Sequence, residues 1–333
     1  MFLRESPSMP TPVRTDSRPR PRRRLLVASA VLAGAIACFL LLFVRGSFEF
    51  AVERRATMLG AMAVAAFAHG LGTVVFHTVT DNRLLTPSIV GFDSLYVLMQ
   101  TVMVFVFGGS VIARTDGTPK VIAQTLTMVL FATILYRWLF SGRLGSLFTM
   151  LLVGVVLGLA FDSLSTFLQR LLSPTEYDLL SVRLFGRLSG VDPGMLPLAF
   201  TVCVAVGVVL WRRRFRLDAL LLGRDSATTI GVDHKRELTL VLVLVALLVS
   251  FSTALAGPMT FFGFIVATMA YQVTGSYKHQ YVLPMAFVLG MLTLVVGQFV
   301  MQHIFYAAGF LTVVIEFAGG LLFLIVVLRK GRL

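Results

Sequence analysis

The sequence predicts an all-α protein that crosses a membrane about ten times. Of its 333 residues, 57% are hydrophobic and only 14% are charged, and the mean hydropathy is +0.88. Apolar stretches recur with lengths close to the roughly 20 residues that a helix needs to cross the hydrocarbon core. The strands of a membrane barrel would alternate apolar and polar residues, and a stretch such as Leu238–Val249 does not. Only helices and closed barrels satisfy backbone groups within lipid, so we expect helices.

The order of apolar and polar stretches divides the chain into a tail and a membrane domain. Residues 1–24 are rich in Pro, Ser and Arg and are predicted to be a disordered basic tail. Residues 25–333 would form the transmembrane permease domain, in which Pro87 and Gly91 indicate a loop that dips into the protein. The expected spans are 25–44, 57–80, 95–112, 121–140, 146–168, 191–210, 238–256, a shorter segment ending near residue 273, 281–302 and 310–328.

The charges predict which side of the membrane the loops occupy. The chain carries 29 Lys and Arg against 16 Asp and Glu, a net charge of +13. With both termini in the cytoplasm, the ten expected spans place most basic residues on the cytoplasmic side, as the positive-inside rule requires. The basic residues therefore indicate orientation in lipid, and we do not expect nucleic-acid binding.

The most basic loop, residues 211–237, lies between the sixth and seventh expected spans. Within it, Gly223 and Gly231 bracket Gly223–Ile230, a segment long enough for about two helical turns. One interpretation is a short helix presented to a soluble cytoplasmic partner. The other is an ordinary basic loop, which composition alone favours.

Residues suited to covalent chemistry or metal binding are scattered. A GxxxxGK[ST] phosphate loop is absent, so the chain does not bind ATP in that manner. Cys38 and Cys203 each lie inside an apolar span and are interpreted as packing residues. His69 and His77 share the second expected span without an acidic partner between them, which favours packed histidines over a metal site. We expect neither a cofactor nor a bound metal.

Three ionisable residues fall in or beside expected spans: Arg137, Asp162 and Glu316. Such groups are costly in lipid and face protein or water. They are interpreted either as a proton or cation relay, or as buried polar contacts and helix-end groups that reach the membrane interface. Their wide separation favours the buried contacts.

Two motifs around the basic loop resemble the permease subunits of the FecCD family, which belong to ABC importers for iron–siderophores, haem and vitamin B12. The family's LGxxxAxxLGV segment is matched at Leu222, Gly223, Ala227, Gly231 and Val232, with Ile230 in place of the Leu. Its AGPIxFxGLIxPH segment is similar to Ala256–Ala270, where Ala267 and Thr268 replace Pro-His.

Further motifs extend the resemblance over nearly everything after residue 25. The family's NPLAxPxxLGxxxG element is matched at Asn82, Pro87 and Gly91. Its WLxGSLSG element resembles Arg183–Gly190, and Val313–Lys330 resembles its closing helix. The order and spacing of these motifs make the resemblance stronger than the basic loop alone.

The resemblance implies the permease fold of a type II ABC importer in the inner membrane of a bacterium. Its partners would be a cytoplasmic ATPase dimer, a second permease, an extracytoplasmic siderophore-binding protein and membrane lipid. The second permease would be a different chain, because the departures at 265–270 and 315–320 resemble the heterodimeric branch. ATP hydrolysis would belong to the partner and shift the permease between its two conformations.

The resemblance also implies two sets of site residues. External arginines of the family bind the binding protein, and here Arg55 matches one such position while Arg54 is a substitute for the other. The coupling helix that contacts the ATPase would comprise Leu222, Gly223, Arg224, Asp225, Ala227, Ile230 and Gly231.

The leading hypothesis is a permease that translocates ferric siderophores. Haem or vitamin B12 is an alternative cargo. An ion-coupled secondary transporter is a different class, and the absence of an inverted repeat and of a charged midplane cluster counts against it. An intramembrane enzyme would need a pair of catalytic groups, which the sequence does not offer.

Overall fold

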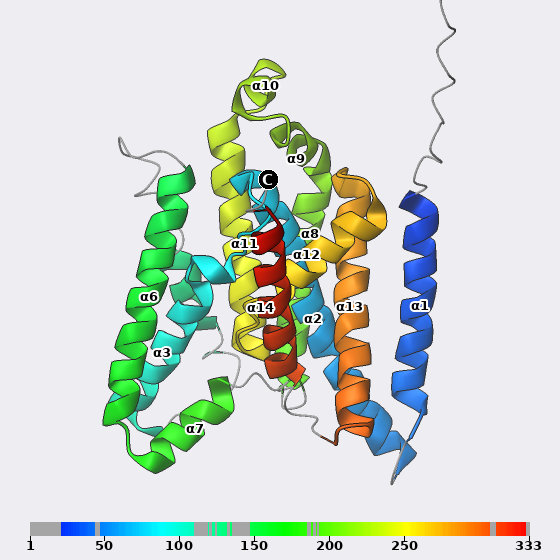
Figure 1. Cartoon of the computed structure of the whole chain (residues 1–333). Helices are drawn as coiled ribbons and strands as arrows, with labels where there is room; N and C mark the ends of the chain where they lie inside the picture. Colours follow the sequence, from blue (N-terminus) through cyan, green and yellow to red (C-terminus); the bar gives the residue numbers. More distant parts are fainter. Residues whose placement is uncertain are drawn as a thin grey trace, which may run out of the picture.

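The computed structural model describes residues 21–43, 47–109, 147–184, 193–306 and 311–330, with short pieces at 119, 122–123, 125–131, 134, 188 and 191. Within these residues every regular element is a helix, which confirms the all-α prediction (Figure 1). In chain order these are α1 (Pro21–Leu41), α2 (Phe48–Thr80), η1 (Ser88–Val90), α3 (Phe92–Phe107), α6 (Leu147–Leu171), α7 (Pro174–Leu184), η3 (Pro193–Met195), α8 (Leu196–Arg212), α9 (Arg214–Leu220), α10 (Arg224–Thr229), α11 (His234–Ala256), α12 (Phe262–Thr274), α13 (His279–His303) and α14 (Leu311–Lys330).

Seven stretches of the described helices are long and apolar enough to cross a membrane. They lie in α1, α2, α6, η3 with α8, α11, α13 and α14, while α3 and α12 are shorter apolar helices. Several helices begin earlier than expected, and the largest difference is at α2, which begins at Phe48. Helix α1 begins at Pro21, a residue suited to the first helical turn. The expected span at 121–140 lies largely outside the described residues, as does most of the expected tail.

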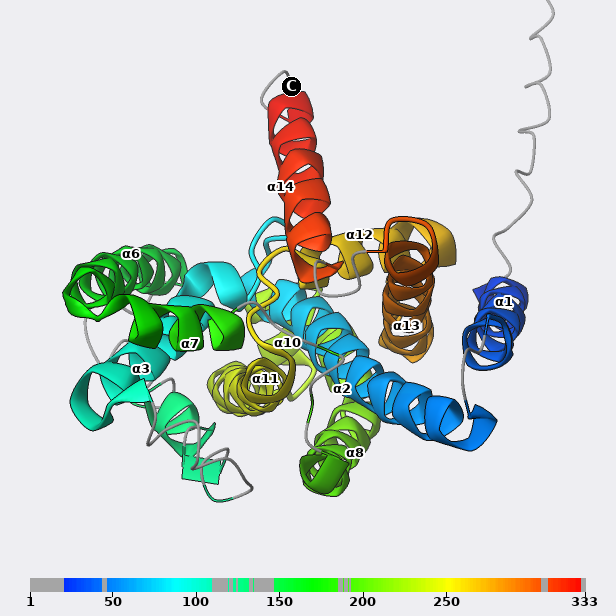
Figure 2. The ribbon, with the colours of Figure 1, turned by 90° about the horizontal axis from the view of Figure 1, so that it is seen from below.

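Helix α2 forms the centre of the bundle. Viewed along the bundle, it crosses the middle of the molecule, with α11 and α8 on one side and α12 and α13 on the other (Figure 2). Small residues permit the closest approach: a Cβ added to Gly290 of α13 would lie 3.1 Å from the Cβ of Ala66 in α2. A Cβ on Gly70 of α2 would lie 3.1 Å from the carbonyl oxygen of Ala286 in α13. Close backbone packing of this kind is how membrane helices associate without a hydrophobic driving force.

The loop around Pro87 and Gly91 enters the protein, as the sequence predicts. Ser88 and Val90 of η1 are buried, and Gly91 adopts a left-handed φ of 104° that suits a residue without a Cβ. A Cβ on Gly91 would lie 3.1 Å from the Cα of Gly158 in α6. Glycines on both sides thus let α6 pack directly on this loop.

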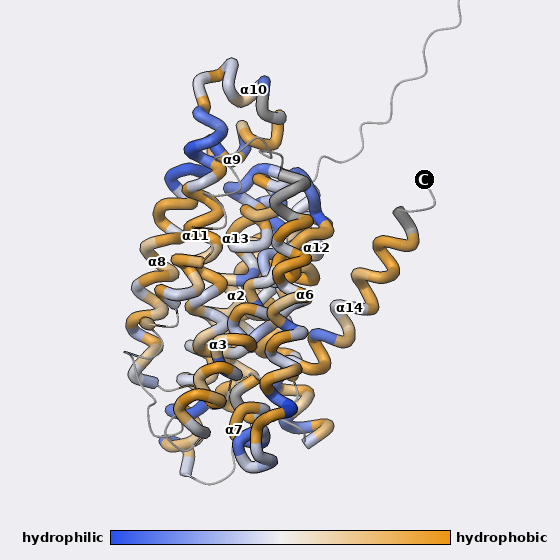
Figure 3. The backbone as a smooth tube through the Cα atoms, turned by 90° about the vertical axis from the view of Figure 1, so that its left-hand side faces the viewer, coloured by the Kyte–Doolittle hydropathy of each residue, from blue (hydrophilic) through white to orange (hydrophobic). Residues whose placement is uncertain are grey.

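Helix α14 extends away from the bundle. Figures 2 and 3 both show it projecting outward, and its contacts are mainly with α12 and α13. Its apolar side chains are widely exposed, including Phe317 at 76% and Leu328 at 61%. Such a surface is expected to face lipid or another subunit.

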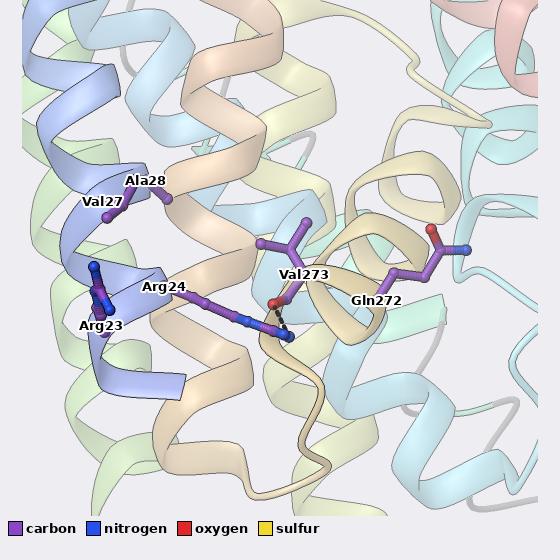
Figure 4. A pocket seen from close by; sticks show the side chains of 6 residues that line it. All are labelled: Arg23, Arg24, Val27, Ala28, Gln272 and Val273. Carbon is purple, nitrogen blue, oxygen red and sulfur yellow. Dashed lines mark hydrogen bonds between the residues drawn. The ribbon is translucent and has the colours of Figure 1, made fainter. Parts of the chain in front are cut away.

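Helix α1 lies at the edge of the bundle beside α13, across the molecule from α6 (Figure 2), and is hydrogen-bonded to the end of α12. The Nη1 of Arg24 donates a hydrogen bond of 3.1 Å to the carbonyl oxygen of Val273 (Figure 4). This carbonyl belongs to the last turn of α12, where carbonyls lack helical partners. The start of α1, the end of α14 and α10 all lie at one end of the bundle, which we call the α10 end (Figure 1).

We expect Gly290→Leu to destabilise the protein, because the larger side chain forces α13 away from Ala66 of α2. Overpacking of this kind costs about 1–3 kcal/mol. The midpoint of thermal unfolding in detergent should fall. The control is Gly34→Leu in α1, where no atom lies within 4 Å of the added Cβ. Equal midpoints for the two variants would contradict the close packing of α2 and α13.

Candidate coupling site at the α10 end

The basic loop contains the predicted short helix. After α8, the chain forms α9 and then α10, which protrudes beyond the other helices before α11 begins (Figure 1). Gly223 and Gly231 flank α10 with φ values of 89° and 87°. Side-chain-bearing residues rarely adopt this backbone conformation, so glycine is needed at both positions. The loop therefore contains a short helix where the sequence predicts one, and its contact with a soluble partner stays a prediction.

A buried carboxylate holds the base of this loop together. Glu237, in the first turn of α11, is only 4% exposed. Its Oε1 accepts hydrogen bonds from Nη1 of Arg213 at 2.5 Å and from Nη1 of Arg216 at 2.7 Å. Burying a charge is costly unless it is paired, and here two guanidinium groups supply the pairing. The contact joins the beginning of α11 to the junction of α8 and α9, and so fixes both ends of the loop.

The expected coupling residues fall into two groups. Leu222, Gly223, Asp225, Ile230 and Gly231 are exposed, with Leu222 at 63% and Ile230 at 60%. Arg224 begins α10, and its side chain lies outside the described residues.

Ala227 differs from the other coupling residues because it is fully buried. Its carbonyl oxygen accepts a 2.9 Å hydrogen bond from the backbone N–H of Val232, which closes the turn after α10. The Ala227 side chain therefore lies on the buried side of α10, and its contact with a partner stays a prediction.

One of the two arginines expected to bind an external partner forms hydrogen bonds within the chain. Arg54 is exposed, whereas Arg55 is only 6% exposed. Nη1 of Arg55 donates to the carbonyl oxygens of Phe39 and Leu42, each at 2.7 Å, and weaker contacts reach two more carbonyls of the same turn. Arg55 therefore supplies hydrogen bonds to the last carbonyls of α1, and its docking role stays a prediction.

The acidic residues within the bundle make local polar contacts. Oε1 of Glu316 in α14 accepts a 3.0 Å hydrogen bond from the backbone N–H of Thr260, and Oδ2 of Asp93 accepts one of 2.9 Å from the Thr260 hydroxyl. Oδ2 of Asp162 accepts a 2.9 Å bond from the Ser94 hydroxyl. The contacts of Glu316 and Asp93 are partly buried and agree with local polar contacts, whereas Asp162 is exposed. Arg137 lies outside the described residues.

The two histidines of α2 pack against aromatic rings. His69 lies edge-on to Phe262, with ring centroids 5.9 Å apart, and His77 stacks on Tyr271 at 6.1 Å. Among the described residues, no three His, Cys, Asp or Glu residues form a group that could hold a metal ion. The packing interpretation of both histidines is thus supported by their neighbours.

Sequence reasoning did not find the ionic contact at the base of the loop. Arg213, Arg216 and Glu237 all lie in the basic loop, but 21 or more positions separate the carboxylate from its partners. Only the turn back through α10 brings them together. A lone acidic residue at the start of an apolar span, facing a run of arginines, is the feature that would have suggested the pairing.

With this geometry established, comparison with known proteins assigns the family. The chain belongs to the FecCD transport family, which it matches over residues 25–329. It is 44% identical over 287 residues to the petrobactin import system permease protein FatC of Bacillus anthracis, covering 86% of this chain and 81% of FatC. It is 36% identical over 306 residues to the petrobactin import system permease protein YclO of Bacillus subtilis, covering 91% and 97%.

Among solved structures, the fold matches that of an inward-facing metal-chelate type ABC transporter. The TM-score is 0.78 at 20% identity, and the match covers 93% of this chain and 99% of the other. The fold is therefore that of a type II ABC importer permease, as expected from the sequence.

We expect Arg55→Ala to lower thermal stability, because it leaves the last carbonyls of α1 without donors. An unsatisfied buried polar group costs about 1–3 kcal/mol. The adjacent, exposed Arg54→Ala is the matched control and should leave the unfolding midpoint almost unchanged. Thermal unfolding of both variants in the same detergent measures the difference. A loss of stability that is the same in both would refute the role of Arg55 at the end of α1.

Proposed function

We propose that this chain is the permease subunit of an ABC importer that moves ferric siderophores into the cytoplasm, with petrobactin as the siderophore. The observation that carries the proposal is the 44% identity to FatC over 86% of the chain. YclO, the second petrobactin permease at 36% identity, supports the same cargo. The substrate would pass through the membrane unchanged, and ATP hydrolysis belongs to a separate subunit.

The α10 end would face the cytoplasm and receive the ATPase. Arg212, Arg213, Arg214 and Arg216 lie at this end, together with Lys235 and Arg236, as the positive-inside rule requires. The start of α1 and the end of α14 lie at the same end, so both termini would be cytoplasmic (Figure 1). Leu222 and Ile230 expose apolar side chains around α10, which suits insertion into a groove of a protein partner.

The second permease would be a different chain. FatC and FatD are both named petrobactin import permeases of Bacillus anthracis, and this chain is 44% identical to FatC but 23% identical to FatD. Escherichia coli likewise has two proteins named as ferric enterobactin permeases, FepG and FepD. Two distinct permeases therefore occur for one siderophore. The exposed apolar faces of α6 and α14 are suited to lie against such a partner or lipid.

An extracytoplasmic binding protein would deliver the siderophore at the opposite end. Arg54 lies near the start of α2, on the side of the bundle away from α10, and remains exposed (Figure 1). A guanidinium group in this position suits an acidic side chain of the binding protein. The contribution would fall with increasing salt, because exposed charges are screened.

Uptake of radiolabelled iron tests the proposed function. We expect cells that lack this chain to lose uptake of ferric petrobactin and to keep uptake of unrelated siderophores. Vanadate, which traps ABC ATPases, should block the uptake, whereas a protonophore should not block it promptly. Loss of haem or vitamin B12 uptake with intact ferric-petrobactin uptake would reassign the cargo. Immediate collapse with the protonophore alone would instead indicate an ion-coupled transporter.

A further inference from the structure

A polar connection runs from the segment before α10 into the core of the bundle. Oδ1 of Asp218 in α9 accepts two hydrogen bonds from His279, the first residue of α13: 2.9 Å from the backbone N–H and 2.7 Å from Nδ1. The other ring nitrogen, Nε2, lies 2.8 Å from the hydroxyl of Thr78 in the last turn of α2. His279 is 2% exposed and Thr78 is 4% exposed. One imidazole ring therefore connects α9, α13 and α2.

The polar groups of this connection all have hydrogen-bond partners. The Thr78 hydroxyl donates its single proton to the carbonyl oxygen of Val74 at 3.1 Å, so it can accept from His279. The Asp218 carboxylate accepts from Nδ1. Burial opposes ionisation of Asp218, but the hydrogen bonds from His279 and the charges of His279 and Lys278 outweigh it and hold its pKa below the usual value. Both ring nitrogens of His279 are thus hydrogen-bonded, Nδ1 to Asp218 and Nε2 to Thr78.

Asp218 lies in the helix directly before α10, so its hydrogen bonds with His279 link the position of α10 to that of α13. Helix α9 buries Leu217 and Leu220 against the bundle, and only Leu221, Leu222 and Gly223 separate it from α10. A displacement of α10 is therefore transmitted to α9 over a very short piece of chain. α9 contacts both α2 and α13, the two helices that form the closest packing in the core.

The space beside the connection is not filled by apolar packing. A cavity of about 50 Å³ is lined by His77, Thr78, Asp81, Arg83, Leu221, Tyr271, Tyr277 and His279. This is room enough for water in a polar setting. The guanidinium of Arg83 lies over the rings of Tyr277 and Tyr271, at 4.5 and 5.1 Å from their centroids. The hydrogen bonds of His279 thus join three helices beside a polar cavity.

We propose that His279, together with Asp218, is the positioning contact that makes the α9–α10 segment move as one unit with α2 and α13. This proposal rests on the coupling function proposed for α10. It adds that force from an ATPase enters the membrane through a hydrogen-bonded pair at the start of α13, of which His279 is buried and Asp218 half-buried. His279 touches neither the cargo nor the ATPase in this arrangement.

The test uses five variants in the assembled importer, reconstituted in proteoliposomes with its binding protein and ATPase. His279→Leu and Asp218→Ala remove the connection, whereas Asp218→Asn keeps an acceptor oxygen in the same place. The double variant Asp218→Ala with His279→Leu completes a cycle that measures whether the two residues act together. Ile230→Asp, on the exposed surface of the loop, serves as a comparison in which ATPase binding itself should be lost.

Two quantities are measured: hydrogen exchange of residues 214–230 and the iron transported per ATP hydrolysed. We expect His279→Leu and Asp218→Ala to retain ATPase binding and basal hydrolysis, to speed exchange in this segment and to lower the transport ratio at least tenfold. The double variant should be no worse than either single variant. Asp218→Asn should stay near the wild-type ratio.

Unchanged exchange in His279→Leu, or effects that multiply in the double variant, would overturn the inference. Loss of ATPase binding in His279→Leu, as in Ile230→Asp, would overturn it too, because the residue would then hold the surface of the loop together and not transmit its motion. The exchange measurement needs no cargo. A wild-type importer that moves no ferric petrobactin would therefore refute the proposed cargo, while exchange and ATPase binding still decide the role of His279.

Discussion

The close packing of α2 against α13 is the contact on which the other elements depend. Lipid offers no hydrophobic gain for bringing two apolar helices together, so the packing requires surfaces that approach to within van der Waals distance. Gly70, Ala66 and Gly290 provide these surfaces. Helices α11 and α12 pack against α2, and α1 packs against α13. At the α10 end, α9 contacts both α2 and α13.

Charged residues form hydrogen bonds at the ends of helices, where apolar packing alone does not hold the elements together. Arg55 satisfies the last carbonyls of α1, Glu237 joins α11 to the start of α9, and Asp218 joins α9 to α13. Each is a buried or half-buried charge with a hydrogen-bonded partner, as such groups must be in a membrane protein. The basic loop is thus more than a marker of orientation. Its charges hold α10 on the bundle.

Local sequence predicted local structure well and long-range contacts poorly. Apolar stretches of about 20 residues located the described spans, and paired glycines located α10, because both features act within one helix or turn. The burial of Ala227 and Arg55 could not be predicted, since it depends on which face meets a neighbouring element. The pairing of Asp218 with His279 joins residues 61 positions apart. Nothing in their surroundings along the chain distinguishes them from surface residues.

The distance between α10 and α13 during the transport cycle tests the central claim most directly. Cys38 and Cys203, the two native cysteines, would be replaced by serine, and spin labels placed at Thr229→Cys and Val296→Cys, both at exposed positions. Electron–electron distances are then compared in the assembled importer without nucleotide and after vanadate trapping, with trapping verified by the loss of ATP hydrolysis. If α10 moves as one unit with α13, the distance distribution stays the same in both states. A shifted distribution would show that α10 moves independently and would contradict the account.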